Sequence, residues 1–303
     1  MVDRVWRPGR PCPVGALLAP LRRGAGDPTY RRDGDDHWLG LRAPTGAATL
    51  RVRSEPALGE VHAQAWGPGA DWALERLPAL LGDADDPAGF TPHHDLVARA
   101  WERHPDLRIG RTDRVMEALV PAVIEQKVTG QEAFAGFRSL VHRYGERAPG
   151  PGGERRLWLQ PGPEALRRVP SWEWLRMHID PARSRALVRA AGVAGSLERL
   201  VTLDGDEADR RLRSLPGIGV WTSAEVRQRA LGDADAVSFG DYHLAKEVGW
   251  ALFGHDIDDE RLAEVLEPYR PQRGRAAMLI LLAGRRRPRR GPRMAPRTHL
   301  PAG

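Results

Sequence analysis

The residues best equipped for chemistry lie between positions 215 and 246. A tight turn, Pro216-Gly217-Ile218-Gly219, separates two segments with helical periodicity. Its glycines let the backbone approach a ligand closely, and the free N–H groups at the start of the next helix attract phosphate. One carboxylate, Asp241, follows Gly219 by 22 residues, at the predicted start of a further helix. The pattern combines an anion-binding turn with an acid able to stabilise positive charge.

Each of these features also has a purely structural interpretation. A Pro-Gly-x-Gly sequence forms ordinary corners between helices, and an Asp at a helix start most often serves only as its N-cap. In the functional interpretation Ile218 anchors the turn in the core and Thr222 caps the second helix. His243 and Lys246 follow Asp241 on its predicted helix and face the same ligand. The combination favours the functional interpretation over the structural one.

Composition excludes several classes of protein. Apolar residues make up 41% of the chain, without an unbroken run long enough to span a membrane. The first residues are too polar and too rich in Pro and Gly for a signal peptide, so we expect a cytoplasmic protein. Cys12 is the single cysteine, which excludes a disulfide framework, a Cys-ligated zinc site and a four-Cys iron–sulfur cluster. His93 and His94 lack a third ligand at a recognisable spacing, so no transition-metal site is predicted.

The net charge of +6 is concentrated at one end of the chain. Residues 285–303 hold seven arginines and no acids, and the remaining residues carry 39 basic and 40 acidic side chains. Nucleic-acid binding by the body must therefore be argued from local motifs. Lys127 and Lys246 are the only lysines, and both lie beside candidate site motifs.

The pattern of apolar residues predicts an α+β, mostly α-helical protein with a smaller antiparallel β-containing domain in front. Alternation at 38–41, 48–53 and 61–66 indicates at least three strands, and short helices at 71–82 and 93–103 are expected to cover one face of their sheet. The predicted regions are an irregular lead-in at 1–36, a β-containing domain at 37–108, a helical domain at 109–284 that includes the two helices and turn at about 205–231, and a disordered Arg-rich tail at 285–303.

Residues 215–222 and 241–246 resemble the helix-hairpin-helix-GPD superfamily of DNA glycosylases. Within it the sequence is most similar to the AlkA-type 3-methyladenine DNA glycosylases. The resemblance covers about residues 109–283 and includes the segments at 124–128 and 269–277. The strand-rich region at 37–108 fits the smaller β-containing domain that AlkA-type proteins carry in front.

The resemblance implies that Asp241 is the catalytic carboxylate. Bifunctional relatives similar to endonuclease III carry a Schiff-base lysine where this chain has Trp221, so strand-nicking lyase activity is not expected. DNA contacts are implied for Lys246 and for the hairpin residues Gly217, Ile218, Gly219, Trp221 and Thr222. These hairpins hold the DNA backbone without reading its sequence.

The resemblance also implies a wedge residue and a base pocket. By position Gln126 and Lys127 are the wedge candidates, although related enzymes often carry an apolar residue there. Gln126 has an alternative role as a helix residue bonded to a buried backbone group. The pocket candidates are Trp221, which also suits a core position, Glu225, which also suits pairing with an arginine, and Leu281. Related hairpins can bind a monovalent cation through backbone carbonyls, and no other cofactor is expected.

The sequence thus predicts a monofunctional enzyme, acting as a monomer, that excises alkylated purines such as 3-methyladenine from duplex DNA without membrane association. Two alternatives remain at this stage. One is a glycosylase for deaminated, oxidised or otherwise damaged bases, and the other is a non-catalytic protein that uses the hairpin to bind distorted DNA. The presence of Asp241 speaks against the second alternative. The Arg-rich tail is expected to add nonspecific, salt-sensitive affinity.

Overall fold

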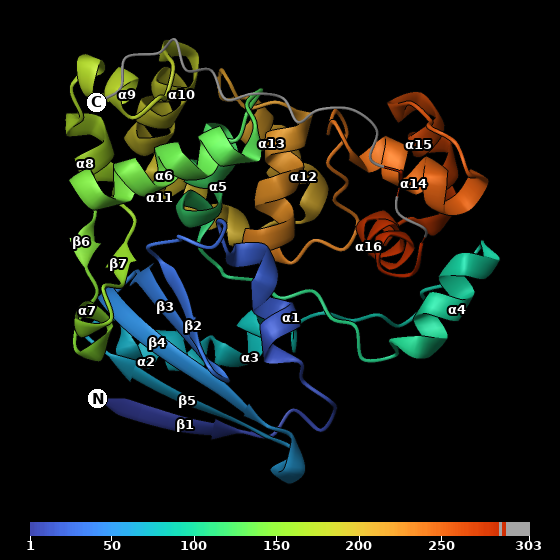
Figure 1. Ribbon diagram of the computed structural model, residues 1–303, viewed down its shortest axis with the longest axis horizontal. Helices are drawn as coiled ribbons and strands as arrows, with labels where there is room; N and C mark the ends of the chain where they lie inside the picture. The colour runs from blue at the N-terminus through green and yellow to red at the C-terminus, as the bar shows by residue number, and fades with distance from the viewer. Residues whose placement is uncertain (285–286, 289–303) are drawn as a thin grey trace.

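The computed structural model describes residues 1–284, 287 and 288 (Figure 1). The predicted tail at 285–303 therefore lies outside the described residues, apart from Arg287 and Pro288. The strands are β1 (Val2–Trp6), β2 (Tyr30–Asp33), β3 (Asp36–Ala43), β4 (Gly46–Glu55), β5 (Glu60–Trp66), β6 (Glu146–Arg147) and β7 (Trp158–Leu159). The helices are α1 (Val14–Leu18), α2 (Ala70–Glu75), α3 (Leu77–Leu80), α4 (Asp95–Arg103), α5 (Val115–Ile124), α6 (Gly130–Tyr144), α7 (Pro151–Glu154), α8 (Pro163–Arg168), α9 (Ser171–Arg176), α10 (Pro181–Gly192), α11 (Ala194–Glu198), α12 (Gly205–Arg213), α13 (Val220–Val226), α14 (Leu244–Phe253), α15 (Asp259–Leu266) and α16 (Arg273–Ala283).

The N-terminal part is a five-stranded antiparallel sheet in the order β1-β5-β4-β3-β2. Leu39, Leu50 and Ala65 face one another in register across β3, β4 and β5, and all three are buried. Their shared face packs against α1, α2 and α3. The period-2 alternation of apolar residues produces this arrangement, because successive side chains of a strand point to opposite faces. We call β1–β5 with α1–α3 the sheet domain.

The prediction of an irregular lead-in at residues 1–36 is wrong. Residues 2–6 form β1, which pairs with β5, and residues 30–33 form β2, which pairs with β3. Both lie at the edges of the sheet, where polar and charged side chains remain solvated. The β2–β3 hairpin turns at Gly34, whose φ of 61° suits glycine.

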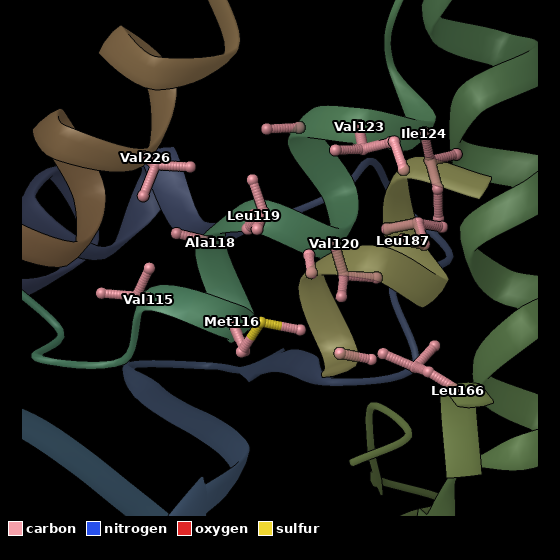
Figure 2. Close-up of a cluster of buried hydrophobic side chains, with 14 of the residues drawn as sticks. Val115, Met116, Ala118, Leu119, Val120, Val123, Ile124, Leu166, Leu187 and Val226 are labelled. Atoms are coloured by element: carbon pink, nitrogen blue, oxygen red, sulfur yellow. The ribbon is translucent and has the colours of Figure 1, made fainter. Parts of the chain in front are cut away.

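The central lobe, formed by α5, α6 and α8–α13, is built around α5. Every residue of α5 except Glu117 is buried. Figure 2 shows its side chains packed between those of neighbouring helices, including Leu187 of α10 and Val226 of α13. A helix that is apolar on nearly all sides belongs in the middle of a helical core, and α5 therefore fixes the position of α13.

The C-terminal lobe consists of α14, α15 and α16 together with α4. The helix predicted at 93–103 does not cover the sheet, because α4 instead packs against α16. An ion pair between Arg275 and Asp85, with atoms 2.6 Å apart, reinforces this contact, and the two side chains are 0% and 4% exposed. Tyr269 adds a 2.6 Å hydrogen bond between its hydroxyl and the His94 ring. Residues 85–103 thus belong to the packing of the C-terminal lobe.

The predicted α+β class, mostly helical with an N-terminal antiparallel sheet, is confirmed. Within the described part of the chain, no helix has the length and apolar character needed to cross a membrane. Figure 1 shows α12 and α13 in the middle of the molecule, between the bulk of the central lobe and the C-terminal lobe. The candidate chemistry of residues 215–246 therefore lies where the two lobes meet.

Candidate active site

The Pro-Gly-Ile-Gly turn joins α12 to α13. Ile218 is 5% exposed and packs into the core of the central lobe, while both glycines of the turn are exposed. The Ile218 N–H donates to the Leu215 carbonyl at 3.0 Å. Gly217 has a φ of 98°, and a Cβ at this position would lie 2.8 Å from the Cβ of Ala186. Glycine is therefore required at 217 both by conformation and by space.

Helix α13 begins at Val220 without a side-chain cap. Gly219 is its N-cap residue and contributes no side chain. The predicted capping role of Thr222 is wrong, because its side chain is buried and its Oγ1 accepts a hydrogen bond from Gln126. The N–H groups of the first turn, which have no intrahelical acceptors, are thus not satisfied by a cap. Gly219 and Val220 are exposed, so this positive helix end is open to an anion.

Gln126 braces the hairpin from the end of α5. Its Nε2 donates to the Gly217 carbonyl at 2.9 Å and to Thr222 Oγ1 at 2.7 Å. Both amide hydrogens are thereby used. Gln126 thus bonds a backbone group as in its structural alternative, although that group belongs to the exposed Gly217 and is not buried. The next residue, Lys127, is exposed and has a φ of 55°. A lysine in this conformation is uncommon and projects from a backbone that Gln126 ties to the hairpin.

Asp241 uses both carboxylate oxygens. Its Oδ1 accepts the N–H groups of His243 and Leu244 at 2.8 and 2.9 Å, in the manner of a helix-capping Asp at the start of α14. Its Oδ2 accepts a hydrogen bond from the Trp221 Nε1–H at 3.1 Å. The side chain remains partly exposed. The capping and functional interpretations are therefore compatible, because each involves a different oxygen.

The hydrogen bond between Trp221 and Asp241 connects the two lobes. Trp221 belongs to α13 and packs against the central lobe, whereas Leu244, three residues after Asp241, packs in the C-terminal lobe. The indole thus positions the carboxylate of one lobe beside the open N-terminus of a helix from the other lobe. An anion at the hairpin and a developing cation at Asp241 would be held by neighbouring segments.

The start of α14 presents polar and aromatic side chains near Asp241. Tyr242 is 72% exposed, and its ring lies 3.8 Å from the Lys246 Nζ. His243 is also exposed and meets the Tyr242 ring edge-on, with ring centroids 4.9 Å apart. The sequence analysis did not predict a role for Tyr242, although this aromatic residue directly follows Asp241 and could have been noticed there. A cation over an aromatic face is a favourable pair that also fixes the direction of the Lys246 side chain.

The three predicted pocket residues have different surroundings. Trp221 and Glu225 lie one turn apart on α13. Glu225 is bonded to Arg229 at 2.7 Å and to the Ser238 hydroxyl at 2.6 Å, as its structural alternative anticipated. Leu281 is 44% exposed on α16, which packs against α14. Two of the three candidates are thus brought together on one helix, while Leu281 belongs to the opposite lobe.

Backbone carbonyls are the available ligands for a cation at the hairpin. Those of Leu215 and Gly217 each accept one hydrogen bond within the protein and retain a second lone pair. No group of three or more metal-ligating side chains occurs among the residues that the structure describes.

A small cavity of about 60 Å³ lies between the sheet and α5, lined by Arg23 and Arg229 among others, but not by hairpin residues or Asp241.

Comparison with known sequences finds one group of similar proteins. The chain is 30% identical over 152 residues to a protein of Mycobacterium tuberculosis described as a probable bifunctional transcriptional activator/DNA repair enzyme AlkA. The match covers 48% of this chain and 29% of the relative, so the chain spans less than a third of the length of the curated relatives it matches. No family model matches the sequence.

Solved structures with the same fold include several that act on DNA bases. A 3-methyladenine DNA-glycosylase from Archaeoglobus fulgidus matches with a TM-score of 0.68 and 17% identity, over 88% of this chain and 93% of its own. An 8-oxoguanine glycosylase/lyase from Clostridium acetobutylicum in complex with DNA gives a TM-score of 0.65 at 12% identity, over 86% and 88% of the two chains. At these identities the comparison establishes the fold.

Proposed function

We propose that this chain, which has the fold of the helix-hairpin-helix DNA glycosylases, is a monofunctional DNA glycosylase that excises alkylated purines of the 3-methyladenine type from duplex DNA. The observation that carries the proposal is the placement of Asp241. Its carboxylate is held by Trp221 next to the open hairpin end of α13. The partial sequence similarity to a protein described as a DNA repair enzyme supports the same conclusion.

The hairpin binds the DNA backbone in this proposal. A phosphate accepts hydrogen bonds from the N–H groups at the start of α13, where no side chain competes. Lys246 adds positive charge from α14, and its Nζ is already directed by the ring of Tyr242. These contacts carry no sequence information, as an enzyme that must find lesions in any sequence requires. The duplex then lies across the junction of the two lobes.

Asp241 supplies the chemistry. Cleavage of the N-glycosidic bond sends both bonding electrons to the departing base and leaves positive charge on the sugar. The carboxylate stabilises that charge, and a preorganised group of this kind is typically worth about 3–4 kcal/mol. A water molecule that the carboxylate orients then forms a C–O bond to the sugar and passes its proton to the carboxylate, which returns it to solvent. An N3- or N7-methylated purine already carries a positive charge, so it departs as a neutral base without an acid to protonate it.

The target base must leave the helix before it reaches Asp241, which costs a few kcal/mol and less at a damaged pair. Lys127 is the proposed wedge, because Gln126 is engaged with the hairpin while Lys127 is exposed beside it. Its aliphatic stem fills the vacated space and its ammonium stays near the phosphates. The extruded base then stacks on Trp221, whose aromatic face suits an electron-poor methylated purine.

The enzyme is expected to lack lyase activity. A strand-nicking glycosylase needs an amine that forms a Schiff base with the sugar, and the indole of Trp221 cannot do so. The lysine on α14, Lys246, has its Nζ over the Tyr242 ring. Treating a reaction with borohydride should therefore trap no covalent protein–DNA complex, and a trapped complex would contradict this part of the proposal.

The proposal is tested by comparing wild type with Asp241→Asn on methylated duplex DNA. Wild type should release free 3-methyladenine or 7-methylguanine and leave sites that break under alkali, while the variant should bind the same duplex without release. Duplexes with deaminated and oxidised bases, assayed in parallel, define the lesion range. Equal release by both proteins would remove Asp241 from the mechanism. Binding without release on every duplex would favour a non-catalytic binding protein.

A further inference from the structure

Helix α10 lies against the hairpin and carries two exposed arginines that the proposed mechanism does not use. A Cβ at Gly217 would lie 2.8 Å from the Cβ of Ala186, so the backbone of the turn rests on this helix. Arg185 directly precedes the buried Ala186, and Arg189 follows it by three residues. Both arginines are exposed. Two cationic side chains thus flank the residue that contacts the turn.

The two arginines share one stripe of α10. Residues four apart are neighbours on a helix surface, separated by a rise of about 6 Å along its axis. Because consecutive residues turn by about 100° around that axis, the stripe with Arg185 and Arg189 adjoins the side on which Ala186 meets Gly217. Among the described residues, neither arginine has an ion pair, a hydrogen bond or a cation–π contact. Both guanidinium groups are therefore available to a ligand.

The arginines of α12, the helix that enters the hairpin, differ in this respect. Arg210 and Arg211 share the carboxylate of Glu207, and Arg213 pairs with Asp209. The acids of α12 thus offset the positive charge of its arginines. Of these two helices beside the turn, only α10 presents exposed arginines without an acidic partner.

Helix α10 is also bonded to the segment that carries the proposed wedge residue, Lys127. The Arg183 side chain is 7% exposed, and its Nη1 donates to the Ile124 carbonyl at 2.7 Å, three positions before Lys127. Its Nε donates to Asp180, the N-cap residue of α10, at 3.0 Å. The stripe of α10, the hairpin and the Lys127 segment are thus joined by direct contacts.

We propose that Arg185 and Arg189 bind phosphates of the duplex next to the phosphate held by the hairpin, so that α10 extends the DNA-binding surface over the central lobe. This inference rests on the DNA binding that the proposed function assigns to the hairpin. A guanidinium can bind a phosphate through two parallel hydrogen bonds and keeps its charge at any physiological pH. Such contacts position the duplex without reading its sequence.

The inference is tested by the double variant Arg185→Gln/Arg189→Gln, because glutamine has nearly the helix propensity of arginine. Binding to a lesion-free, fluorescently labelled duplex is followed by anisotropy between about 50 and 500 mM salt. Each lost phosphate contact flattens the slope of log binding constant against log salt by about 0.9, so the variant should lose about 1.8. Its affinity should fall roughly 10- to 100-fold at about 0.1 M salt, and the difference should shrink as the salt rises.

The matched control is Arg99→Gln/Arg103→Gln. These arginines are also four residues apart on one helix, α4, exposed and without a partner among the described residues. Helix α4 packs against α16 in the C-terminal lobe, so the control removes the same charge and should leave the slope unchanged. Arg185→Lys/Arg189→Lys keeps both charges and should keep most of the slope, which separates a lost phosphate contact from a disturbed helix.

An unchanged slope in the glutamine variant of α10, or an equal flattening in the α4 control, would overturn this role of Arg185 and Arg189. Release of methylated purines by wild type would then leave the proposed function intact. At saturating protein, single-turnover release by the glutamine variant should match wild type, because neither arginine takes part in the chemical step. Absence of release by wild type on every lesion, with a flattened slope in the variant, would refute the proposed function and leave α10 as a DNA-binding surface.

Discussion

Replacing Trp221 with phenylalanine isolates its hydrogen bond to Asp241, the proposed catalytic carboxylate. Phenylalanine keeps an apolar ring that can stack on a base and pack against the central lobe. It removes the Nε1–H that donates to Asp241 Oδ2 at 3.1 Å. Stacking and hydrogen bonding are therefore separated in one variant. If the indole acts mainly as a stacking surface, base release should hardly change, whereas a positioning role predicts a slower chemical step.

The size of the effect follows from the hydrogen bonds that remain. A hydrogen bond to a charged group contributes about 1.5–3 kcal/mol, and 1.36 kcal/mol corresponds to a factor of ten in rate. Asp241 keeps two backbone donors, the N–H groups of His243 and Leu244 at 2.8 and 2.9 Å. Both bind Oδ1, so they hold the carboxylate in place without fixing Oδ2. We therefore expect the lower end of the range, about a tenfold slower release.

Single-turnover release from methylated duplex DNA, with enzyme in excess, measures this step directly. Trp250→Phe is the matched control, because Trp250 also donates its indole N–H to an aspartate, Asp256, at 2.6 Å. The Trp250–Asp256 hydrogen bond is exposed to solvent and involves neither Asp241 nor a residue of the hairpin. The control removes the same atoms from the same kind of bond and should leave the release rate unchanged.

A wild-type release rate in Trp221→Phe would refute the reasoning, since Asp241 would then need no indole to hold it. An equal loss in Trp250→Phe would show that the assay reports general stability. A loss in Trp221→Phe that is matched by weaker binding to abasic DNA would assign the indole to DNA contact. Only slower release with unchanged binding supports the positioning role.

Three further predictions follow from individual contacts. Arg275→Met leaves the carboxylate of Asp85 buried without its partner and should destabilise the fold by about 3–5 kcal/mol in urea unfolding, an effect that Asp85→Asn in the same chain should partly reverse. Because burial raises the pKa of Glu125, its ionised form weakens folding above the unfolded pKa of about 4.3. The melting temperature of Glu125→Gln relative to wild type should therefore rise between that pH and neutrality. Because the substitution also leaves the buried Arg23 without its ion-pair partner, the test is this change with pH; a difference that does not vary with pH would contradict the raised pKa. Gly217→Ala should destabilise the protein, because residue 217 has a positive φ and a Cβ there would meet Ala186. Gly219→Ala, where a Cβ meets open space, should fold normally and lose affinity for DNA. Equal melting temperatures for the two variants would argue against the requirement for glycine at residue 217.

The parts of the site that were predictable from sequence are those encoded in short segments. The turn at 216–219 is specified by its own glycines, and Ile218 by its apolar character between them. Asp241 stands at a helix start, where its side chain reaches N–H groups only two and three residues away. The strands at 38–66 likewise follow from alternation, because burial on one face imposes a period of two.

The parts that sequence reasoning missed depend on partners far along the chain. Gln126 reaches Gly217 across 91 positions and Thr222 across 96, and the second of these contacts engages the Thr222 hydroxyl that was expected to cap α13. The edge strand β1 lacks a period-2 alternation of apolar residues and is specified by pairing with β5, about 60 residues away. Arg23 meets Glu125 only because the sheet domain packs against α5. No local pattern encodes such contacts, although the Asp-Gly turn at residues 33–34 did offer a readable signal for β2.

Asp241 shows why the structural and functional interpretations of one residue need not compete. A carboxylate that caps a helix has its orientation fixed by backbone N–H groups, which is a requirement for a preorganised catalytic group. In this protein the cap occupies Oδ1 and leaves Oδ2 with the single donor of Trp221. Oδ2 therefore retains acceptor capacity while the side chain cannot rotate freely. In the proposed reaction, a developing positive charge on a sugar at the hairpin would meet a carboxylate whose orientation is already restricted, so the cap that makes Asp241 look ordinary in the sequence would contribute to its proposed catalytic role.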